Sequence, residues 1–475
     1  MSIDKANFEG FIAAFQSAAD EFKKICDKKK VRLVSNLDAD GISAASIMVH
    51  ALERQGIEYS LLILHQLLED DVKALAEEDY PIFVFCDLGS GQLKHINKYL
   101  SERRVFVLDH HEIQGQPGKD VVQLNPHDHG YEGSTEISAA GVCFFFAREL
   151  DKRNEELAHL AIIGAIGDVQ EKDGFKALNK KILEIAVNNK IIRVEKGLKL
   201  FGLETRPLNK LLMYSGDIII PEVTNDDKGS RRFLKELGIK SFCRGEPRNF
   251  YDLSDDERKL FVDGIIKKRK EAGMECADEI YTNIYFIEGE KRGPFRDAKE
   301  FSTLLNSCGR MDNATLGIGA CLGDEKQRKE AVRSLKDYRR QIVNSLCWFK
   351  KNSTEGSSRI IKGHNYLIIN ARDDVLSTII GTLASMISKN KSFEKDIFVL
   401  SMARNDDDTT KISLRISGNP ACVDLKEVIA GIVSIVGGEA GGHQHAAGAI
   451  IETGKEDEFI ACAKETFESM CRENQ

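Results

Sequence analysis

Hydrophobic residues follow two alternating patterns along the first 200 residues. Residues 3–27 place Phe8, Phe15 and Phe22 among apolar positions three or four residues apart, which predicts an amphipathic helix. Short apolar runs predict β-strands at residues 31–35, 59–64, 81–86 and 105–108. Helical patterns stand between and after these runs, at residues 42–52, 69–78, 138–150 and 157–168. This alternation predicts an α/β fold with a parallel sheet covered by helices on both faces.

The pattern changes twice further along the chain. Helical periodicity dominates the middle, at residues 256–271 and 325–349, and a linker rich in Ser, Gly and Lys follows at 351–358. The remainder alternates again, with strands expected at 366–369, 396–401 and 411–416 and a helix at 375–388. We therefore expect three domains, at residues 1–195, 196–360 and 361–475.

Composition and charge narrow the class of protein. The chain has 475 residues, of which 42% are hydrophobic and 30% charged, as in ordinary folded proteins. Its formal net charge of −8 excludes a wholly basic nucleic-acid coat but leaves room for a local basic surface. The first residues lack a signal-peptide pattern, no apolar stretch reaches the roughly 20 residues of a membrane span, and the 11 cysteines form no C-x-x-C pair. We expect a cytoplasmic protein with free thiols and no membrane partner.

Acidic residues stand where the predicted strands end. They are Asp38 and Asp40 after the first strand, Asp87 after the third, Asp109 with His110 and His111 after the fourth, and Asp168 after a buried helix. Each alone is explained as well by a helix cap or a polar turn. Carboxyl ends of parallel strands meet at one edge, however, and so many carboxylates would repel one another without cations. Carboxylate and imidazole ligands favour Mn²⁺ or Mg²⁺, and two such ions sharing a carboxylate promote phosphoester hydrolysis.

These segments, in this order, resemble the DHH phosphoesterase superfamily. The tail Gly441-Gly442-His443-Gln444-His445-Ala446-Ala447-Gly448 resembles the G-G-H-x-x-A-A-G signature of the DHHA1-type substrate-binding domain paired with it in nucleases. The segment from Arg296 to Arg310 is similar to archaeal RecJ-like nucleases. The resemblance covers nearly the whole chain. It implies an N-terminal DHH domain, a mixed middle region and a smaller C-terminal α/β domain, with the active site in the cleft between the domains.

The resemblance also implies a role for each matching residue. Asp38 would bind one metal ion, Asp40, His110 and Asp168 would bind a second, and Asp87 would bridge the two. His111 would lie close to the reacting phosphate, with Asp109 beside it as the other catalytic residue. The family usually has a histidine two residues before Asp38, where this chain has Asn36. Because an amide is a poorer ligand than imidazole, the occupancy and identity of the first metal stay open.

Residues near the C-terminus would bind the substrate. Gly441 and Gly442 allow the backbone to approach a phosphate, and His443 can donate a hydrogen bond to it. Ser413 and Arg415 lie two residues apart, on one face of a predicted strand, and Arg415 can pair with a phosphate. A tight turn and a surface salt bridge would explain these residues equally well without the resemblance.

The function that follows is a metal-dependent exonuclease. It would use two ions, Mn²⁺ or Mg²⁺, to hydrolyse phosphodiester bonds at an end of single-stranded DNA or RNA in replication or repair. One alternative is a phosphodiesterase for short oligonucleotides or cyclic dinucleotides. Another is a largely non-catalytic replication scaffold, since relatives of this family joined the replicative helicase beside the GINS complex, and GINS is therefore a possible partner.

Overall fold

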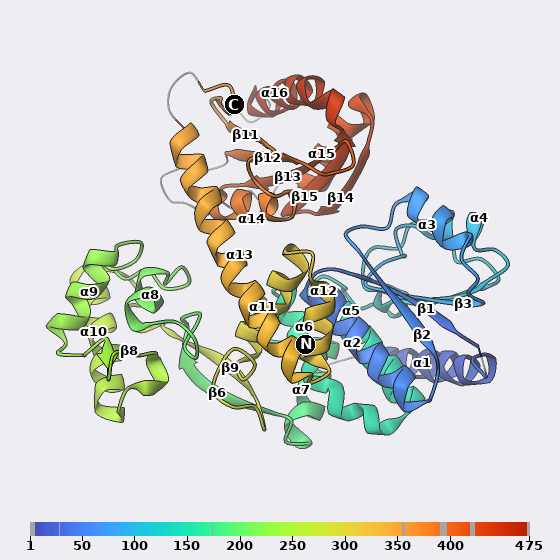
Figure 1. Ribbon diagram of the computed structural model, residues 1–475, viewed down its shortest axis with the longest axis horizontal. Coiled ribbons are helices and arrows are strands. Elements are labelled where there is room, and N and C mark those ends of the chain that lie inside the picture. The colour runs from blue at the N-terminus through green and yellow to red at the C-terminus, as the bar shows by residue number, and fades with distance from the viewer. Residues whose placement is uncertain are drawn as a thin grey trace. The chain divides into compact units, whose positions relative to one another are not determined.

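A computed structural model describes residues 5–27, 29–172, 174–353, 357–389, 397–418 and 423–472. The chain divides into two compact units, Met1–Ser334 and Leu335–Gln475. Figure 1 gives the labels of the elements in both units. Each unit has its own sheet and its own buried apolar residues, so each is described by itself.

The first unit is built on a five-stranded sheet with the strand order β2-β1-β3-β4-β5, in which every pair is parallel. The strands are β1 (Val31–Asn36), β2 (Tyr59–Leu64), β3 (Ile82–Cys86), β4 (Arg104–Leu108) and β5 (Val121–Leu124). The central strand β3 is buried at every position, as its continuous run of apolar residues requires. The parallel α/β fold expected from the sequence is confirmed. Strand β5 was not predicted from the sequence, because it is short and half-exposed and shows no clear strand pattern.

Helices cover this sheet. They are α1 (Lys5–Ile25), α2 (Ala39–Arg54), α3 (Glu69–Ala76), α4 (Leu93–Tyr99), α5 (Ala139–Leu150), α6 (Ala158–Gly167) and α7 (Ala177–Asn188), with short 3₁₀ turns at Pro126–His129 and Lys152–Leu157. Helix α1 buries Phe11, Phe15 and Phe22, and the Phe22 ring meets Phe106 of β4 edge to face. Of the three phenylalanines that predicted this helix, Phe15 and Phe22 are buried and Phe8 is partly buried, and Phe11 completes the packed face.

A separate apolar core forms within the middle of the chain. Strands β6 (Ile192–Leu198) and β9 (Tyr281–Ile287) pair antiparallel, and the residues between them fold into a body of their own, green in Figure 1. Its elements are α8 (Leu208–Met213), α9 (Asp227–Glu236), β7 (Phe242–Cys243), β8 (Glu246–Pro247), a 3₁₀ turn (Phe250–Asp252) and α10 (Asp255–Glu271). After β9, helices α11 (Ala298–Arg310) and α12 (Ala314–Cys321) pack on α2, and α11 also packs on α6. The middle region thus returns to the sheet domain.

The second unit is a six-stranded sheet with the order β10-β11-β12-β13-β15-β14, in which only β11 and β12 run parallel. Its strands are β10 (Ile360–Lys362), β11 (Tyr366–Arg372), β12 (Phe398–Arg404), β13 (Thr409–Ile416), β14 (Glu439–His443) and β15 (Ala446–Glu452). Its helices are the end of α13 (Glu325–Asn352), α14 (Ser377–Ser388), α15 (Leu425–Val436) and α16 (Glu456–Arg472), with a 3₁₀ turn at Thr453–Lys455. Helix α14 packs on one face of the sheet, and α15 and α16 pack on the other.

The structure also bears on the expectations about membrane spans and cysteines. None of the helices in the described ranges is long and apolar enough to cross a membrane. The nine cysteines whose side chains the structure describes, from Cys26 to Cys462, are free thiols. The limits of the three domains expected from the sequence stay a prediction.

Candidate metal centre

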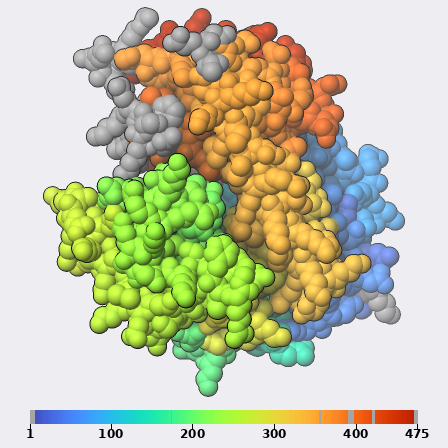
Figure 2. All heavy atoms as spheres, turned by 60° about the vertical axis from the view of Figure 1, so that its left-hand side comes forward, coloured from blue at the N-terminus to red at the C-terminus, as the bar shows by residue number. Residues whose placement is uncertain are grey.

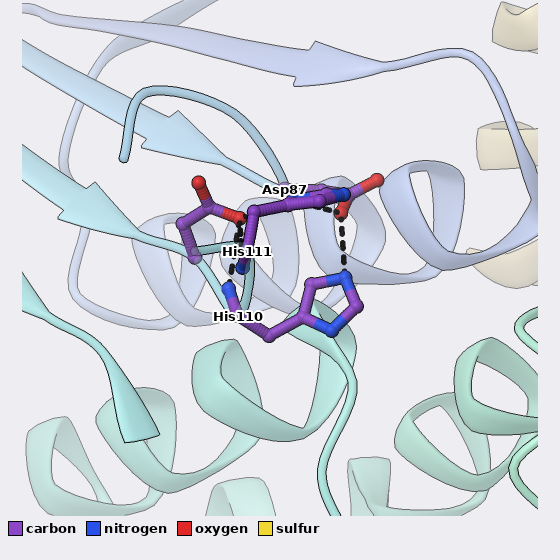
Figure 3. Close-up of side chains that lie close together, drawn as sticks. Asp87, His110 and His111 are labelled. Atoms are coloured by element: carbon purple, nitrogen blue, oxygen red, sulfur yellow. Dashed lines mark hydrogen bonds and ion pairs between the residues drawn. The ribbon is translucent and has the colours of Figure 1, made fainter. Parts of the chain in front are cut away.

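Three strand ends bring acidic residues together at the carboxyl edge of the first sheet. Strand β3 lies between β1 and β4, so the residues that follow these strands are neighbours. Asp87 follows β3 and adopts the left-handed backbone conformation, with a φ of 61°. Figure 3 shows Asp87 beside His110 and His111, which follow β4. The convergence expected from the sequence is therefore present for these residues.

The His110 ring lies in the middle of the carboxylates and is nearly fully buried. Its Nε2 atom lies 3.4 Å from Asp87 Oδ1, 3.5 Å from Asp168 Oδ2 and 3.9 Å from Asp40 Oδ2. Its Nδ1 atom lies 2.8 Å from the carbonyl oxygen of Gly133. Because a carbonyl can only accept, Nδ1 carries a proton, so a neutral ring would have its lone pair on Nε2, the atom that faces the carboxylates. That is the tautomer a metal ligand needs.

The Asp40 carboxylate is held by the start of a helix. It is buried, and its two oxygens accept the N–H groups of Ala139 at 2.6 Å and of Ala140 at 3.0 Å, at the N-terminus of α5. Gly164 of α6 lies so close that a β-carbon there would be 2.3 Å from Asp40 Oδ1. Two helices therefore fix this carboxylate and leave it no room to turn away from His110.

Asp109 has a different environment. Its Oδ2 accepts the N–H of Ser90 at 2.9 Å, and its Oδ1 accepts the N–H of His110 at 2.8 Å and lies 2.7 Å from Nδ1 of His111. The carboxylate therefore orients His111, whose side chain is 37% exposed. The main-chain carbonyl of His111 accepts from Asn125, which fixes the same segment from the other side.

The pKa directions agree with a cation site. Burial raises the pKa of Asp40, Asp87 and Asp168, and neighbouring carboxylates raise it further. Burial alone would lower the pKa of His110, but Asp87, Asp168 and Asp40 hold it well above its ordinary value. For Asp109 the histidines outweigh burial, and its pKa lies below its ordinary value. A bound cation would relieve the repulsion among the three carboxylates.

Two overlapping sets of side chains could hold metal ions. One set is Asp40, His110 and Asp168, and the other is Asp87, Asp109, His110 and His111, with ligand atoms within 4.8 Å of one another in each set. Asp38 and Asn36 lie in neither set. Asp38 caps α2 by accepting the N–H of Gly41 at 3.0 Å, and Asn36 Oδ1 accepts the N–H of Leu37 at 2.7 Å. The structure therefore assembles most, but not all, of the residues expected to bind metal.

Sequence reasoning missed the groups that hold this site in place. Gln170 donates to the Gly133 carbonyl at 2.9 Å and accepts from Asn179 at 2.6 Å, so it steadies the acceptor of His110. Asn306 of α11 accepts the N–H of Ala39, between the two acids of the first loop, at 3.0 Å. Asn306 lies in the segment from Arg296 to Arg310 that carried part of the resemblance, whereas nothing in the local pattern distinguished Gly133 or Gln170.

The expected substrate-binding residues lie in the second unit. Strand pairing places Ser413 opposite Gly448 and Gly448 opposite Gly441, so three small residues form a row across β13, β15 and β14. Gly442 has a φ of 130°. The Arg415 guanidinium donates to Ser385 at 3.0 Å and to the carbonyl of Leu414 at 2.8 Å. The backbone of His443 ends β14, but its side chain lies outside the described residues.

Models of three protein families match the chain, in the order of the sequence. The N-terminal domain of the DHH family matches residues 30–165, the DHH-CID domain matches residues 200–280, and the DHHA1 domain matches residues 363–469.

Two curated proteins illustrate the sequence similarity. The chain is 29% identical over 441 residues to an uncharacterized protein of Methanocaldococcus jannaschii, a match that covers 90% of this chain and 91% of the relative. It is 27% identical over 169 residues to the single-stranded-DNA-specific exonuclease RecJ of Bacillus subtilis, which covers 32% of this chain but only 21% of that protein.

Solved structures share the fold across nearly the whole chain. RecJ of Thermus thermophilus in complex with Mn²⁺ has a TM-score of 0.58 at 16% identity, covering 96% of this chain and 55% of that chain. Cdc45 of Entamoeba histolytica has a TM-score of 0.66 at 12% identity, covering 96% of this chain and 99% of that chain. The chain therefore spans about half of the Thermus protein and the whole length of the Cdc45 chain.

Proposed function

We propose that this chain, a RecJ-like protein with DHH, DHH-CID and DHHA1 domains, is a metal-dependent exonuclease that hydrolyses phosphodiester bonds at an end of single-stranded DNA or RNA. One observation carries the proposal. The Nε2 atom of His110 faces three buried carboxylates, while its other ring nitrogen is committed to the Gly133 carbonyl. Such a set repels itself when empty and becomes favourable around a cation.

The donor set fits Mn²⁺ or Mg²⁺. Carboxylate and imidazole ligands without a thiolate suit these ions, and Mn²⁺ accepts imidazole more readily than Mg²⁺ does. Asp40, His110 and Asp168 would hold one ion, and Asp87 would be shared with a second ion at Asp38. When bound, the ions would supply Lewis-acid activation of water and charge neutralisation at the phosphate.

The surrounding residues would bind and orient the substrate. Asp109 orients the partly exposed ring of His111 through Nδ1, and in its doubly protonated form the ring could donate from Nε2 to a phosphate oxygen. In the second unit, the small residues Ser413, Gly441 and Gly442 would let a phosphate approach the sheet. Arg415 would contribute its charge there, and His443 a further donor.

A replication scaffold is the second candidate function. The fold match to Cdc45 favours it, and so does the side chain of Asn36, which bonds to the N–H of the next residue instead of standing ready as a ligand. A GINS-type partner belongs to this hypothesis. The scaffold hypothesis does not explain why Asp40, Asp87, His110 and Asp168 are brought together around one point.

The test is digestion of one labelled single strand, as DNA and as RNA, with Mn²⁺, with Mg²⁺ and with EDTA. We expect metal-dependent shortening by the native chain and none by Asp87→Asn, and labels at the 5′ and 3′ ends would give the direction. Asp70→Asn, at an exposed helical residue, is the matched control and should leave digestion unchanged. A folded native chain that cleaves neither strand with either metal would refute the exonuclease and favour the scaffold.

A further inference from the structure

Helix α13 is strongly basic in an acidic protein. Its 28 residues, Glu325–Asn352, contain nine lysines and arginines and three acids, whereas the whole chain has a net charge of −8. The helix buries Ala331, Ser334 and Leu335 along one side. Atoms of α13, in the yellow-to-orange part of the colour scale, lie on the surface seen in Figure 2.

Five exposed basic residues of α13 fall on a single face, while Lys350 and Lys351, also exposed, stand apart near the end of the helix. Lys326, Lys329, Arg333, Lys336 and Arg340 follow one another at alternating steps of three and four residues, and all five are exposed. Steps of three and four keep side chains on the same face of a helix. We call these five residues the basic stripe. At a rise of 1.5 Å per residue it is about 21 Å long, or about six nucleotide steps at the 3.4 Å spacing of one duplex strand.

The three acids of α13, Glu325, Glu330 and Asp337, each lie three or four residues from a member of the basic stripe, but the cations outnumber them. Here each member of the basic stripe has a like-charged neighbour three or four residues away, which destabilises the helix, and Lys326 lies in the first turn, where the helix dipole disfavours cations. The arginines have acidic partners on α13 itself, Glu330 for Arg333 and Asp337 for Arg340. Their side chains stay 71% and 70% exposed, so these pairs are weak. The three lysines make no ion pair within the described part of the chain.

We propose that the basic stripe binds the sugar–phosphate backbone of a single-stranded nucleic acid. This inference rests on the proposed function and adds to it a second contact surface. A row of exposed cations at a regular spacing neutralises successive phosphates and carries no information about bases. The stripe therefore contributes affinity without sequence preference, as an exonuclease that degrades any sequence requires.

The experiment compares two triple variants of the full chain. The stripe variant is Lys329→Gln with Arg333→Gln and Lys336→Gln, and glutamine keeps a good helix propensity. The control is Lys259→Gln with Lys267→Gln and Lys270→Gln, which removes the same charge from exposed positions of α10. Binding of a fluorescent 20-nucleotide single strand is measured in EDTA over a range of salt concentrations, so that no metal-dependent digestion occurs.

We expect the stripe variant to bind about tenfold or more weakly near 0.1 M salt. The slope of log K against log salt should become shallower by about 2, since each lost phosphate contact removes about 0.7. The control should stay within about twofold of the native chain. Equal weakening of binding in both variants would mean that binding depends on the overall charge of the protein, which would overturn the proposal. Unchanged binding by the stripe variant would also overturn it.

Digestion in Mn²⁺ separates this proposal from the function on which it rests. If the native chain does not cleave but its binding of the strand depends on the basic stripe, only the exonuclease proposal is refuted. Cleavage by the native chain with unchanged binding of the stripe variant would refute only the stripe. Equal thermal unfolding temperatures of the variants would show that both are folded.

Discussion

The side chain of Asn306 accepts a hydrogen bond from the N–H of Ala39, a residue 267 positions earlier in the chain. Ala39 lies between Asp38 and Asp40, so the bond fixes the loop that carries both acids. Gly309, one helical turn later, lies against the same loop, and a β-carbon there would be 1.8 Å from the carbonyl oxygen of Leu37. Helix α11 therefore serves as the support of the metal-binding loop.

Replacing Asn306 by alanine should weaken metal binding as well as stability. The N–H of Ala39 would lose its partner, which destabilises the fold by about 1–3 kcal/mol, and the loop would hold its acids less firmly. Calorimetric titration with Mn²⁺ should give a lower affinity than for the native chain. Asn344→Ala, at an exposed position of α13, is the control. Lower stability with an unchanged Mn²⁺ affinity would mean that Asn306 supports the fold but not the site.

Asp87→Asn should make the metal-free protein more stable. Burial raises the pKa of the native Asp87 carboxyl, and the charges of Asp38 and Asp40 raise it further, so the charged form is disfavoured. The amide has the same shape, carries no charge and tolerates the positive φ of this position. We expect a gain of about 1–2 kcal/mol in EDTA by chemical denaturation.

The same variant should lose the stabilisation that Mn²⁺ gives. For the native chain, Mn²⁺ at 100 times its dissociation constant should add about 2.7 kcal/mol. Asp70→Asn should follow the native chain in both conditions. If Asp87→Asn is less stable in EDTA and still gains from Mn²⁺, Asp87 is a structural residue and not a shared ligand.

The acids at the strand ends could be predicted from the sequence because both signals are local. A short apolar run identifies each strand, and parallel strands end at a common edge, so Asp87 and Asp109 were expected at the same edge of the sheet. The role of Asp109 was harder to predict, because its carboxylate is engaged in hydrogen bonds with the Ser90 N–H and the His111 ring. The hydrogen bond between the Ala39 N–H and Asn306 joins residues far apart in the chain. It depends on how α11 packs, which cannot be predicted from a local sequence pattern.

In the second unit, too, contacts that depend on packing between distant elements could not be predicted from the sequence. The two-residue spacing of Ser413 and Arg415 predicted a shared strand face, and the structure has both on β13. The hydrogen bond of Arg415 to Ser385 depends on the packing of α14 against that strand, so the sequence could not reveal it. Strands β14 and β15 were not predicted as a pair, since their glycines and alanines have weak strand propensity.

Val169 occupies a position that suits glycine. It follows Asp168 with a φ of 61°, its N–H bonds to Ile166 at 3.0 Å, and the N–H of Gln170 bonds to Ala165 at 3.0 Å, the pattern of a helix end in the left-handed conformation. A β-branched residue is strained there. Val169→Gly should therefore raise stability by about 1 kcal/mol, measured by thermal unfolding. Val187→Gly, within α7, should lower it by a similar amount, and a loss in both variants would contradict the strain.

Glu300 should make stability depend on pH near neutrality. Its carboxylate accepts the N–H of Glu204 at 2.8 Å and contacts the Thr205 hydroxyl, and burial with Asp297 nearby raises its pKa from 4.5 to about 7. The folded protein therefore binds this proton more tightly than the unfolded chain does. The stability it contributes is full below about pH 4.5 and is lost as the pH rises through about 7.

Glu300→Gln removes this titration and keeps the shape of the side chain. At pH 8 the variant should be more stable than the native chain by up to about 3 kcal/mol, and the difference should shrink toward pH 5. Urea unfolding at pH 5, 6, 7 and 8 measures it. Glu330→Gln, at a side chain 40% exposed on α13, should leave the pH profile of the native chain unchanged. A Glu300→Gln profile parallel to that of the native chain would mean that Glu300 is ionised throughout this range, with its charge stabilised by the Glu204 N–H and the Thr205 hydroxyl.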